Sequence, residues 1–144
     1  SAIAPAQQTA AIRKVHDFLT VGARAPLQAA GAIGFAFDAD YFNHLALDYK
    51  ARLNMLAPVL QDAGFKFTIP EGAYYLFADF SGISDKDDVT FAKWLIEEVG
   101  VATVPGSSFY HDKTHGAKYV RFAFCKKFET MRRAAERLAV LGTN

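Results

Sequence analysis

The clearest pattern of hydrophobic positions lies in residues 40–61, where apolar residues recur at steps of three and four. These positions are Phe42, Leu45, Tyr49, Leu53, Leu56 and Leu60. The spacing predicts one amphipathic helix, with Gly64 as its stop signal and a kink at Pro58 in its last turn. Residues 6–19 and 25–37 are also predicted to be helical.

After Gly64 the pattern changes to a period of two, which is typical of strands. The segments 65–70 ("FKFTIP") and 73–80 ("AYYLFADF") are predicted to form a hairpin around the turn "PEG". A short strand is expected at 101–106 and a longer one at 118–125. The longer strand alternates between an apolar face (Val120, Phe122, Phe124) and an opposite face (Tyr119, Arg121, Ala123). Arg121 is therefore expected to point away from the core.

Two further helices complete the pattern. Asp88 is expected to cap a helix that Gly100 ends, with Ala92, Leu95, Ile96 and Val99 on its apolar stripe. A helix over 128–142 has an apolar face made of Phe128, Met131, Ala135 and Leu138. These elements predict an α+β fold, a small and mostly antiparallel sheet covered by helices. The first 35 residues contribute apolar helices and no strand, so their packing partner is expected to lie outside this unit.

Composition and charge narrow the class of protein. The chain has 144 residues, 51% of them hydrophobic, and a net charge of +1 from interspersed basic and acidic residues. No basic field exists to hold a phosphate backbone, so nucleic acid is not an expected partner. The longest apolar stretch, 31–37, is too short to span a bilayer, and the first residues do not resemble a signal peptide. A single cysteine, Cys125, suits a reducing cytosol, and the protein is expected to be cytoplasmic.

Several candidate sites are weak when judged from the residues alone. His111 and His115 have a metal-ligand spacing, but they lie in a loop-like segment without a third ligand, so no metal site is expected. Ser108 lacks a nucleophile motif, and Cys125 is expected to be an inert core thiol. The amides around Ser107 can form an anion nest, although most such turns are only turns.

Arg121 is the strongest candidate. Its guanidinium group matches a carboxylate or a phosphate, and a strand holds this group more precisely than a loop does. From the pattern alone, two interpretations stay open for Arg121: a solvent-facing or salt-bridged arginine, and an anion receptor.

Four segments in this order carry a resemblance to a known family: "AIRKVHDFLTVGARAPLQ" (11–28), "PEGAYYLFADFS" (70–81), "VPGSSFY" (104–110) and "YVRFAFCK" (119–126). Together they resemble the C-terminal part of class I/II, fold-type I aminotransferases that depend on pyridoxal phosphate, in particular the branch similar to kynurenine, aspartate and methionine aminotransferases. The resemblance implies an aminotransferase small domain over residues 36–144 and a helical remnant of the large cofactor domain over 1–35. It also implies a homodimer at full length.

The same resemblance assigns roles to individual residues. Arg121 matches the arginine that binds the α-carboxylate of the amino-acid or keto-acid substrate. Tyr74 and Tyr75 match a segment with an aromatic residue in the substrate pocket, and Tyr75 is slightly favoured. "VPGSSF" resembles a loop that shapes the mouth of the site.

The cofactor lysine of the family belongs to a segment upstream of the matched stretch. No lysine of this chain lies in such a context; they are Lys14, Lys50, Lys66, Lys86, Lys93, Lys113, Lys118, Lys126 and Lys127. The chain is thus expected to hold no catalytic residue, to bind no pyridoxal phosphate by itself, and to be inactive without the missing N-terminal large domain. A free-standing carboxylate-binding module and a structural association domain of the same fold are the alternative interpretations.

Overall fold

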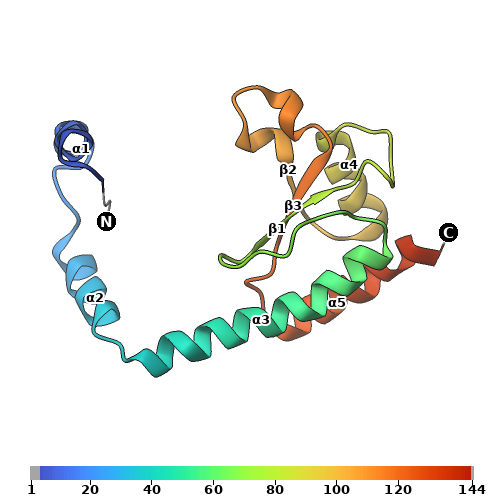
Figure 1. Ribbon diagram of the computed structural model, residues 1–144, viewed down its shortest axis with the longest axis horizontal. Helices are drawn as coiled ribbons and strands as arrows, with labels where there is room; N and C mark the ends of the chain where they lie inside the picture. The colour runs from blue at the N-terminus through green and yellow to red at the C-terminus, as the bar shows by residue number, and fades with distance from the viewer. Residues whose placement is uncertain (1–3, 144) are drawn as a thin grey trace. The chain divides into compact units, whose positions relative to one another are not determined.

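The computed structural model describes residues 4–143 and divides into two compact units, with the boundary between Phe42 and Asn43 (Figure 1). The first unit contains α1 (Ala6–Leu19) and α2 (Ala25–Phe35). The predicted helices at these positions are present, and neither of them buries a residue in the described chain. Phe18 (93% exposed) and Phe35 (83% exposed) show how much apolar surface this unit leaves uncovered.

Helix α3 (Ala39–Asp62) runs across the boundary and continues through Pro58 to Asp62. Only its second half joins the core, through Leu53, Leu56, Ala57 and Leu60. Phe42 and Leu45 belong to the same predicted stripe but are exposed. The helical period therefore identified the helix correctly, whereas burial of its apolar face is restricted to the part that packs on the sheet.

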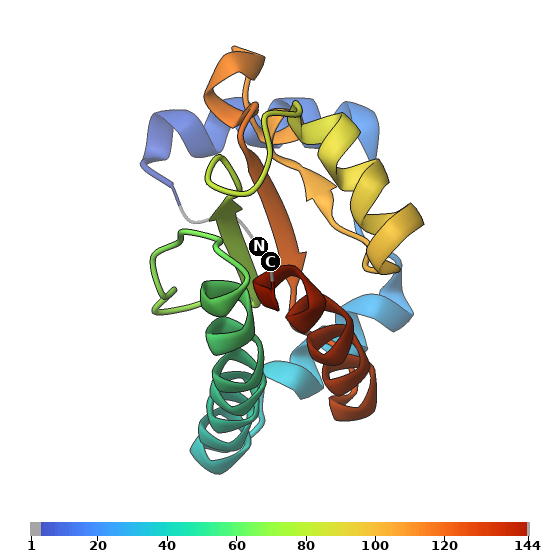
Figure 2. The same cartoon turned by 90° about the vertical axis from the view of Figure 1, so that its right-hand side faces the viewer.

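The sheet of the second unit has three antiparallel strands in the order β1-β3-β2: β1 (Tyr75–Asp79), β2 (Val104–Pro105) and β3 (Tyr119–Ala123). With helices packed on it, this small sheet confirms the predicted α+β fold. Figure 2 shows the strands side by side, with α5 in front of them.

The predicted hairpin is wrong. Residues 65–70 form no strand and contribute only a single bridge, between Lys66 and Asp79. Strand β1 instead pairs along its whole length with β3, which lies more than 40 residues further along the chain. Pro70 has no N–H to donate to a ladder, and alternation in a short segment does not specify its partner.

The second unit also contains α4 (Asp88–Trp94), a π-helical turn (Leu95–Val99) and α5 (Phe128–Leu138), together with short 3-10 turns. The π-turn changes the helical period, so that Leu95 is buried while Ile96 is 51% exposed, contrary to the predicted stripe. Phe128 was also expected to be buried, yet it lies at the start of α5 and is 42% exposed.

The core lies between the helices and one face of the sheet. It includes Phe65, Leu76, Phe80, Phe91, Leu95, Val120, Phe122, Phe124, Met131 and Leu138. Val120, Phe122 and Phe124 are all buried, as the alternation along this strand predicted, and the opposite face of the sheet is left half-exposed.

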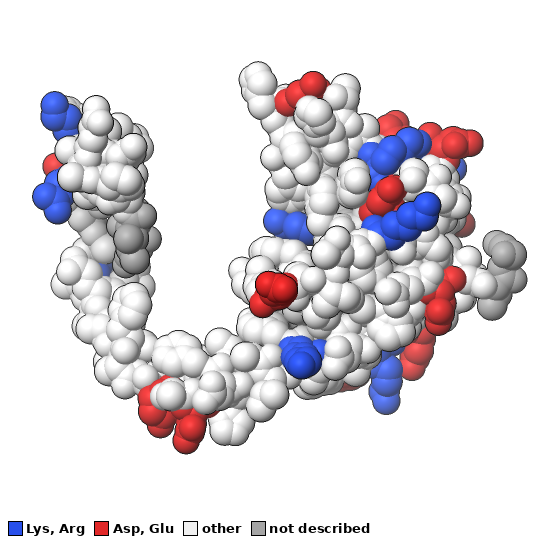
Figure 3. Space-filling view, in the orientation of Figure 1, with Lys and Arg blue, Asp and Glu red and all other residues white. Residues whose placement is uncertain are grey.

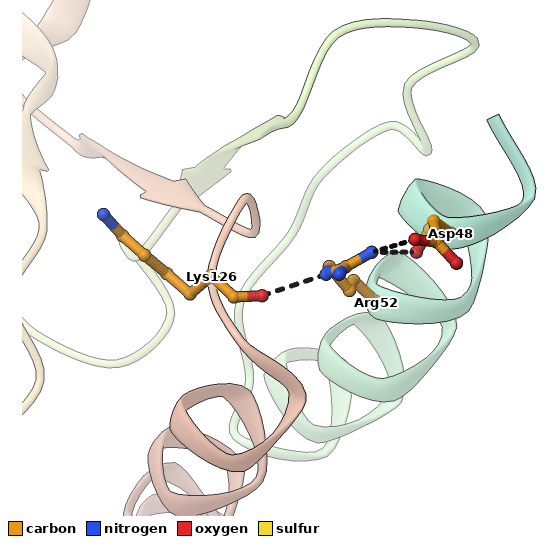
Figure 4. A network of polar contacts seen from close by, with 3 residues as sticks. All are labelled: Asp48, Arg52 and Lys126. Atoms are coloured by element: carbon orange, nitrogen blue, oxygen red, sulfur yellow. Dashed lines mark hydrogen bonds and ion pairs between the residues drawn. The ribbon is translucent and has the colours of Figure 1, made fainter. Parts of the chain in front are cut away.

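Arg52 connects α3 to the chain that leaves β3 (Figure 4). Its Nε atom donates to the carbonyl oxygen of Lys126 at 2.9 Å, and its Nη1 atom donates to the carbonyl oxygen of Asp48 at 2.8 Å. The guanidinium group also lies 4.6 Å from the ring centre of Phe128. Arg52 thus fixes the direction in which the chain runs from β3 into α5.

Candidate functional site

The candidate site is the face of the sheet that points away from the helices. Tyr75 and Phe77 of β1 and Tyr119 and Arg121 of β3 lie there, and each is half-buried. Arg121 pairs with Phe77 on one side and with Val104 on the other. A side chain on the central strand has its backbone held by both neighbours, so Arg121 starts from a rigid position.

Two aromatic rings enclose the guanidinium group of Arg121. Its Cζ atom lies 4.0 Å from the ring centre of Tyr75 and 4.3 Å from that of Phe109. A contact of this kind stabilises the cation by about 0.5 to 2 kcal/mol, depending on its exposure to water. The Nε atom is buried and has no hydrogen-bond partner among the described residues. No carboxylate of the described chain forms an ion pair with Arg121. Packing against the two rings therefore orients this arginine.

Three other arginines of the same unit, Arg52, Arg132 and Arg137, have polar partners. Arg52 binds two carbonyl oxygens, Arg137 donates to the carbonyl oxygen of Gly100 at 2.7 Å, and Arg132 forms an ion pair with Glu136 at 3.8 Å. These residues support the backbone or the surface of a helix. Arg121 differs from these three because two rings hold it and its terminal nitrogens are left with donor capacity for a ligand.

The tyrosines at the start of β1 contact each other. The ring centres of Tyr74 and Tyr75 are 4.4 Å apart, and Tyr74 also stacks on Tyr49 of α3 at 5.8 Å. The hydrogen bond with Tyr75, then repulsion from the ionised form of Tyr75, and then burial raise the pKa of Tyr74. Of the two candidate residues, Tyr75 is the one that lies against Arg121.

The loop 104–109 was expected to shape the mouth of the site, but its contacts could not be recognised in the sequence. Phe109 ends the 3-10 turn η2 (Gly106–Phe109), and the amide of Ser107 in that turn donates to the buried carboxylate of Asp88 at 2.7 Å. Asp88 was expected to cap α4, but the cap is Asp87, whose carboxylate accepts from the amide of Thr90. Two adjacent aspartates before a helix do not reveal which of them turns inward. With its Ser107 amide occupied, the turn has less capacity to act as an anion nest.

The segment that was expected to form the first strand of the hairpin borders this face. A shallow hollow on this face is lined by Lys66, Phe67, Thr68, Pro70, Tyr75, Phe77, Asp79 and Tyr119, and Arg121 is not among its lining residues. Phe77 and Tyr119 stack in parallel with their ring centres 4.9 Å apart, and Tyr110 lies 6.2 Å from Phe77. The surroundings of the arginine are therefore mainly aromatic.

The remaining candidates lie elsewhere. His111 and His115 are exposed, and residues 4–143 contain no group of three or more side chains that could hold a metal. Cys125 is exposed, contrary to the expectation of a core thiol. It follows the end of β3 and, two residues after Ala123, continues the alternation on the side of Arg121 and Ala123, away from the core.

No described helix is long and apolar enough to cross a membrane. On the face of the second unit that Figure 3 shows, basic and acidic side chains are interspersed. Neither observation adds a second binding surface to the site around Arg121.

Comparison with known proteins identifies the family. The model of the family "Aminotransferase class I and II" matches residues 2–138. A methionine aminotransferase of Escherichia coli is 37% identical over 96% of this chain, and a kynurenine–oxoglutarate transaminase of Dictyostelium discoideum is 32% identical over 96%. The matches cover 36% and 37% of those proteins, so this chain spans little more than a third of their length.

Solved structures agree with the sequence comparison. The crystal structure of the Escherichia coli protein with a methionine aminotransferase function superposes with a TM-score of 0.79 at 37% identity, covering 96% of this chain and 36% of that one. The structure of N-succinyldiaminopimelate aminotransferase from Mycobacterium tuberculosis gives 0.83 at 34% identity, with coverages of 97% and 36%. This chain therefore belongs to the class I and II aminotransferases.

Proposed function

We propose that this chain is the C-terminal part of an aminotransferase that moves an amino group between an amino acid and a keto acid, and that Arg121 binds the α-carboxylate of the substrate. The observation that carries this proposal is the ring-enclosed guanidinium group, which has no carboxylate partner among the described residues. In the same proposal, residues 1–35 belong to the large domain and residues 36–144 form the small domain of a cytoplasmic homodimer.

The chemistry of the site suits a carboxylate. Charge-assisted hydrogen bonds contribute about 1.5 to 3 kcal/mol each, and a guanidinium group can make two in parallel to one carboxylate. Because Tyr75 and Phe109 already restrict the rotamers of Arg121, a substrate loses less affinity to side-chain ordering. Arg121 would therefore both bind the substrate and set its orientation. Tyr75 would form the adjacent pocket wall, and Tyr74 would support Tyr75 from the side.

Pyridoxal phosphate, which the family implies, does not fit the residues of this chain. A lysine that forms a Schiff base is commonly activated by desolvation in an apolar pocket. The side chains of the lysines in this chain are exposed, with the exception of Lys118. Lys118 is half-buried, but its Nζ atom donates to the carbonyl oxygens of Asp85 and Lys86 at 2.8 and 2.9 Å. The proposal therefore assigns substrate orientation to this chain and cofactor chemistry to the remainder of the enzyme, and it predicts no transaminase activity for the chain alone.

A second candidate function is carboxylate binding by the chain itself, as a free-standing module. The observation in its favour is that both rings around Arg121 come from this chain. Titration calorimetry of the chain with amino and keto acids separates the two functions. The enzyme proposal predicts no binding tighter than about millimolar, because half of the pocket walls are missing. Micromolar binding would support the module.

The enzyme proposal is tested in the protein that carries this chain with its large domain. Arg121→Lys retains the charge but loses the planar pair of donors, so we expect KM for amino-acid substrates to rise by about 10 to 100 fold. Arg52→Lys is the matched control, because Arg52 binds carbonyl oxygens away from the site. An unchanged KM in Arg121→Lys would overturn the proposal.

A further inference from the structure

We propose that Asp88 is a positioning residue for Arg121, acting through the amide of Ser107 and the ring of Phe109. We call this chain of contacts, from Asp88 through Ser107 and Phe109 to Arg121, the relay. That the relay affects substrate binding rests on the proposed function. The family resemblance gave no role to Asp88, and it assigned the loop that contains Phe109 only to the mouth of the site.

The first step is the carboxylate of Asp88. The residue is only 3% exposed, and its Oδ2 atom accepts from the Ser107 amide at 2.7 Å, across 19 residues of sequence. Burying a carboxylate is unfavourable unless hydrogen bonds compensate for the lost water. Capping does not explain this burial, because Asp87 already caps α4. The hydrogen bond from the Ser107 amide of turn η2 is the interaction that compensates for the burial of the Asp88 carboxylate.

The second step is the position of turn η2. A Cβ atom added to Gly106 would lie 2.5 Å from the carbonyl oxygen of Gly116 and 2.6 Å from that of Tyr119. The backbone of the turn is thus pressed against the segment that leads into β3. Asp88 holds the turn from the side of α4, and the contact with Gly116 holds it from the other side. The turn has two fixed points within four residues.

The third step is the ring of Phe109, the last residue of this turn. It lies 4.3 Å from the guanidinium carbon of Arg121 and meets Phe77 edge to face at 6.0 Å. Phe109 is 44% exposed, so few contacts other than these define its position. If the bond between Asp88 and Ser107 is lost, we expect the ring to move and the guanidinium group to gain rotamers.

The geometry is tested without substrate, by NMR of protein labelled with ¹⁵N-arginine. The Nε–Hε resonance of Arg121 is assigned by its absence in Arg121→Lys, and two flanking rings should shift it away from the position of an exposed arginine. We expect Asp88→Ala and Phe109→Leu to move the resonance in the same direction. Asp88→Asn keeps the acceptor oxygen and should stay near the wild type. Asp87→Ala, which removes only the cap, is the neighbouring control.

The effect on binding is tested with the complete enzyme. Asp88→Ala and Phe109→Leu should each raise KM for amino acids by about 2 to 30 fold, the range that corresponds to one cation–π contact. The double variant should show no more than the larger single effect, because both changes break one chain of contacts. Phe109→Leu does not touch the buried carboxylate, so it tests the last step of the relay, the contact of Phe109 with Arg121, even if Asp88→Ala fails to fold.

The outcomes separate the two proposals. An Arg121 resonance that stays in place in Asp88→Ala or Phe109→Leu overturns the relay. A resonance that moves in both variants while KM is unchanged in them and also in Arg121→Lys supports the relay and overturns Arg121 as the carboxylate receptor. Strictly additive effects on KM in the double variant would also contradict the relay.

Discussion

Arg121 and Tyr75 are diagonal neighbours on two paired strands, with the Cζ atom of Arg121 4.0 Å from the centre of the Tyr75 ring. The residues directly opposite them are Phe77 and Ala123, respectively. Long side chains on one face of a sheet reach such diagonal neighbours. The ring contact is therefore a property of the register, and a shift of one residue between β1 and β3 would move Tyr75 to the other face.

Arg52 should contribute to stability without affecting ligand binding. Arg52→Ala removes the hydrogen bond to Lys126, the bond to Asp48 and the contact with the Phe128 ring. We expect the free energy of unfolding to fall by about 1 to 2 kcal/mol, measured by urea denaturation. Arg132→Ala, which breaks an exposed pair with Glu136, is the control and should change it by less than about 0.5 kcal/mol. Equal losses in both variants would contradict the structural role of Arg52.

Asp87 should make stability depend on acid pH. Hydrogen bonds from the amide and the hydroxyl of Thr90 hold the pKa of Asp87 below its ordinary value. A lowered pKa in the folded state means that the contribution is complete above the unfolded value of about 3.9 and is lost as the pH falls through the folded value. Urea denaturation between pH 5 and pH 2.5 should show a shallower acid loss for Asp87→Ala than for the wild type. Parallel curves would disprove the effect.

Gly106 should not tolerate a side chain, whereas Gly72 should. An added Cβ atom at Gly106 meets the backbone of Gly116 and Tyr119, while nothing lies within 4 Å of the corresponding position at Gly72. We expect Gly106→Ala to cost about 1 to 3 kcal/mol of unfolding free energy and Gly72→Ala to change it by less than about 0.5 kcal/mol. Thermal denaturation of the two variants in one buffer makes the comparison, and a neutral Gly106→Ala would show that the turn can move away.

Ala73 carries backbone strain immediately before the two tyrosines. Its φ of 61° lies in the left-handed region, which costs an L-residue about 1 to 2 kcal/mol and glycine almost nothing. Glycine also has more freedom in the unfolded chain, which offsets part of this gain. Ala73→Gly should therefore stabilise the protein by a net amount of up to about 1 kcal/mol. In Ala51→Gly, the same change inside α3, we expect a loss of about 0.5 to 1 kcal/mol. Denaturant midpoints that fall in both variants would argue against strain at Ala73.

The sequence predicted best what depends on neighbouring residues. A period of 3.6 identified α3, and helix-start signals at Pro5 and Pro26 identified α1 and α2. The period of 2 along β3 put Arg121 on the correct face of the sheet. The same parity, applied one step further, would have placed Cys125 outside the core. That error arose from the residue type, because cysteines are so often buried.

What the sequence could not predict depends on contacts between distant segments. Three features were missed: the pairing of β1 with β3, the choice of Asp87 over Asp88 as the cap, and the position of the Phe109 ring over Arg121. The pattern of polar and apolar residues in one segment does not show which other segment it contacts. The π-turn from Leu95 to Val99 was not predicted either, because five residues are too few to show a periodic pattern of apolar positions. For the candidate site, the sequence predicted the direction of the arginine but not the rings that hold it.

The middle position of β3 in the sheet also limits how the arginine can travel. A strand at an edge can peel away by breaking one row of backbone bonds, whereas β3 would have to break the rows to β1 and to β2 together. The backbone that bears Arg121 is thus confined to the frame of the whole sheet. The backbone of Arg121 can therefore move toward or away from a substrate only when the whole sheet moves with it.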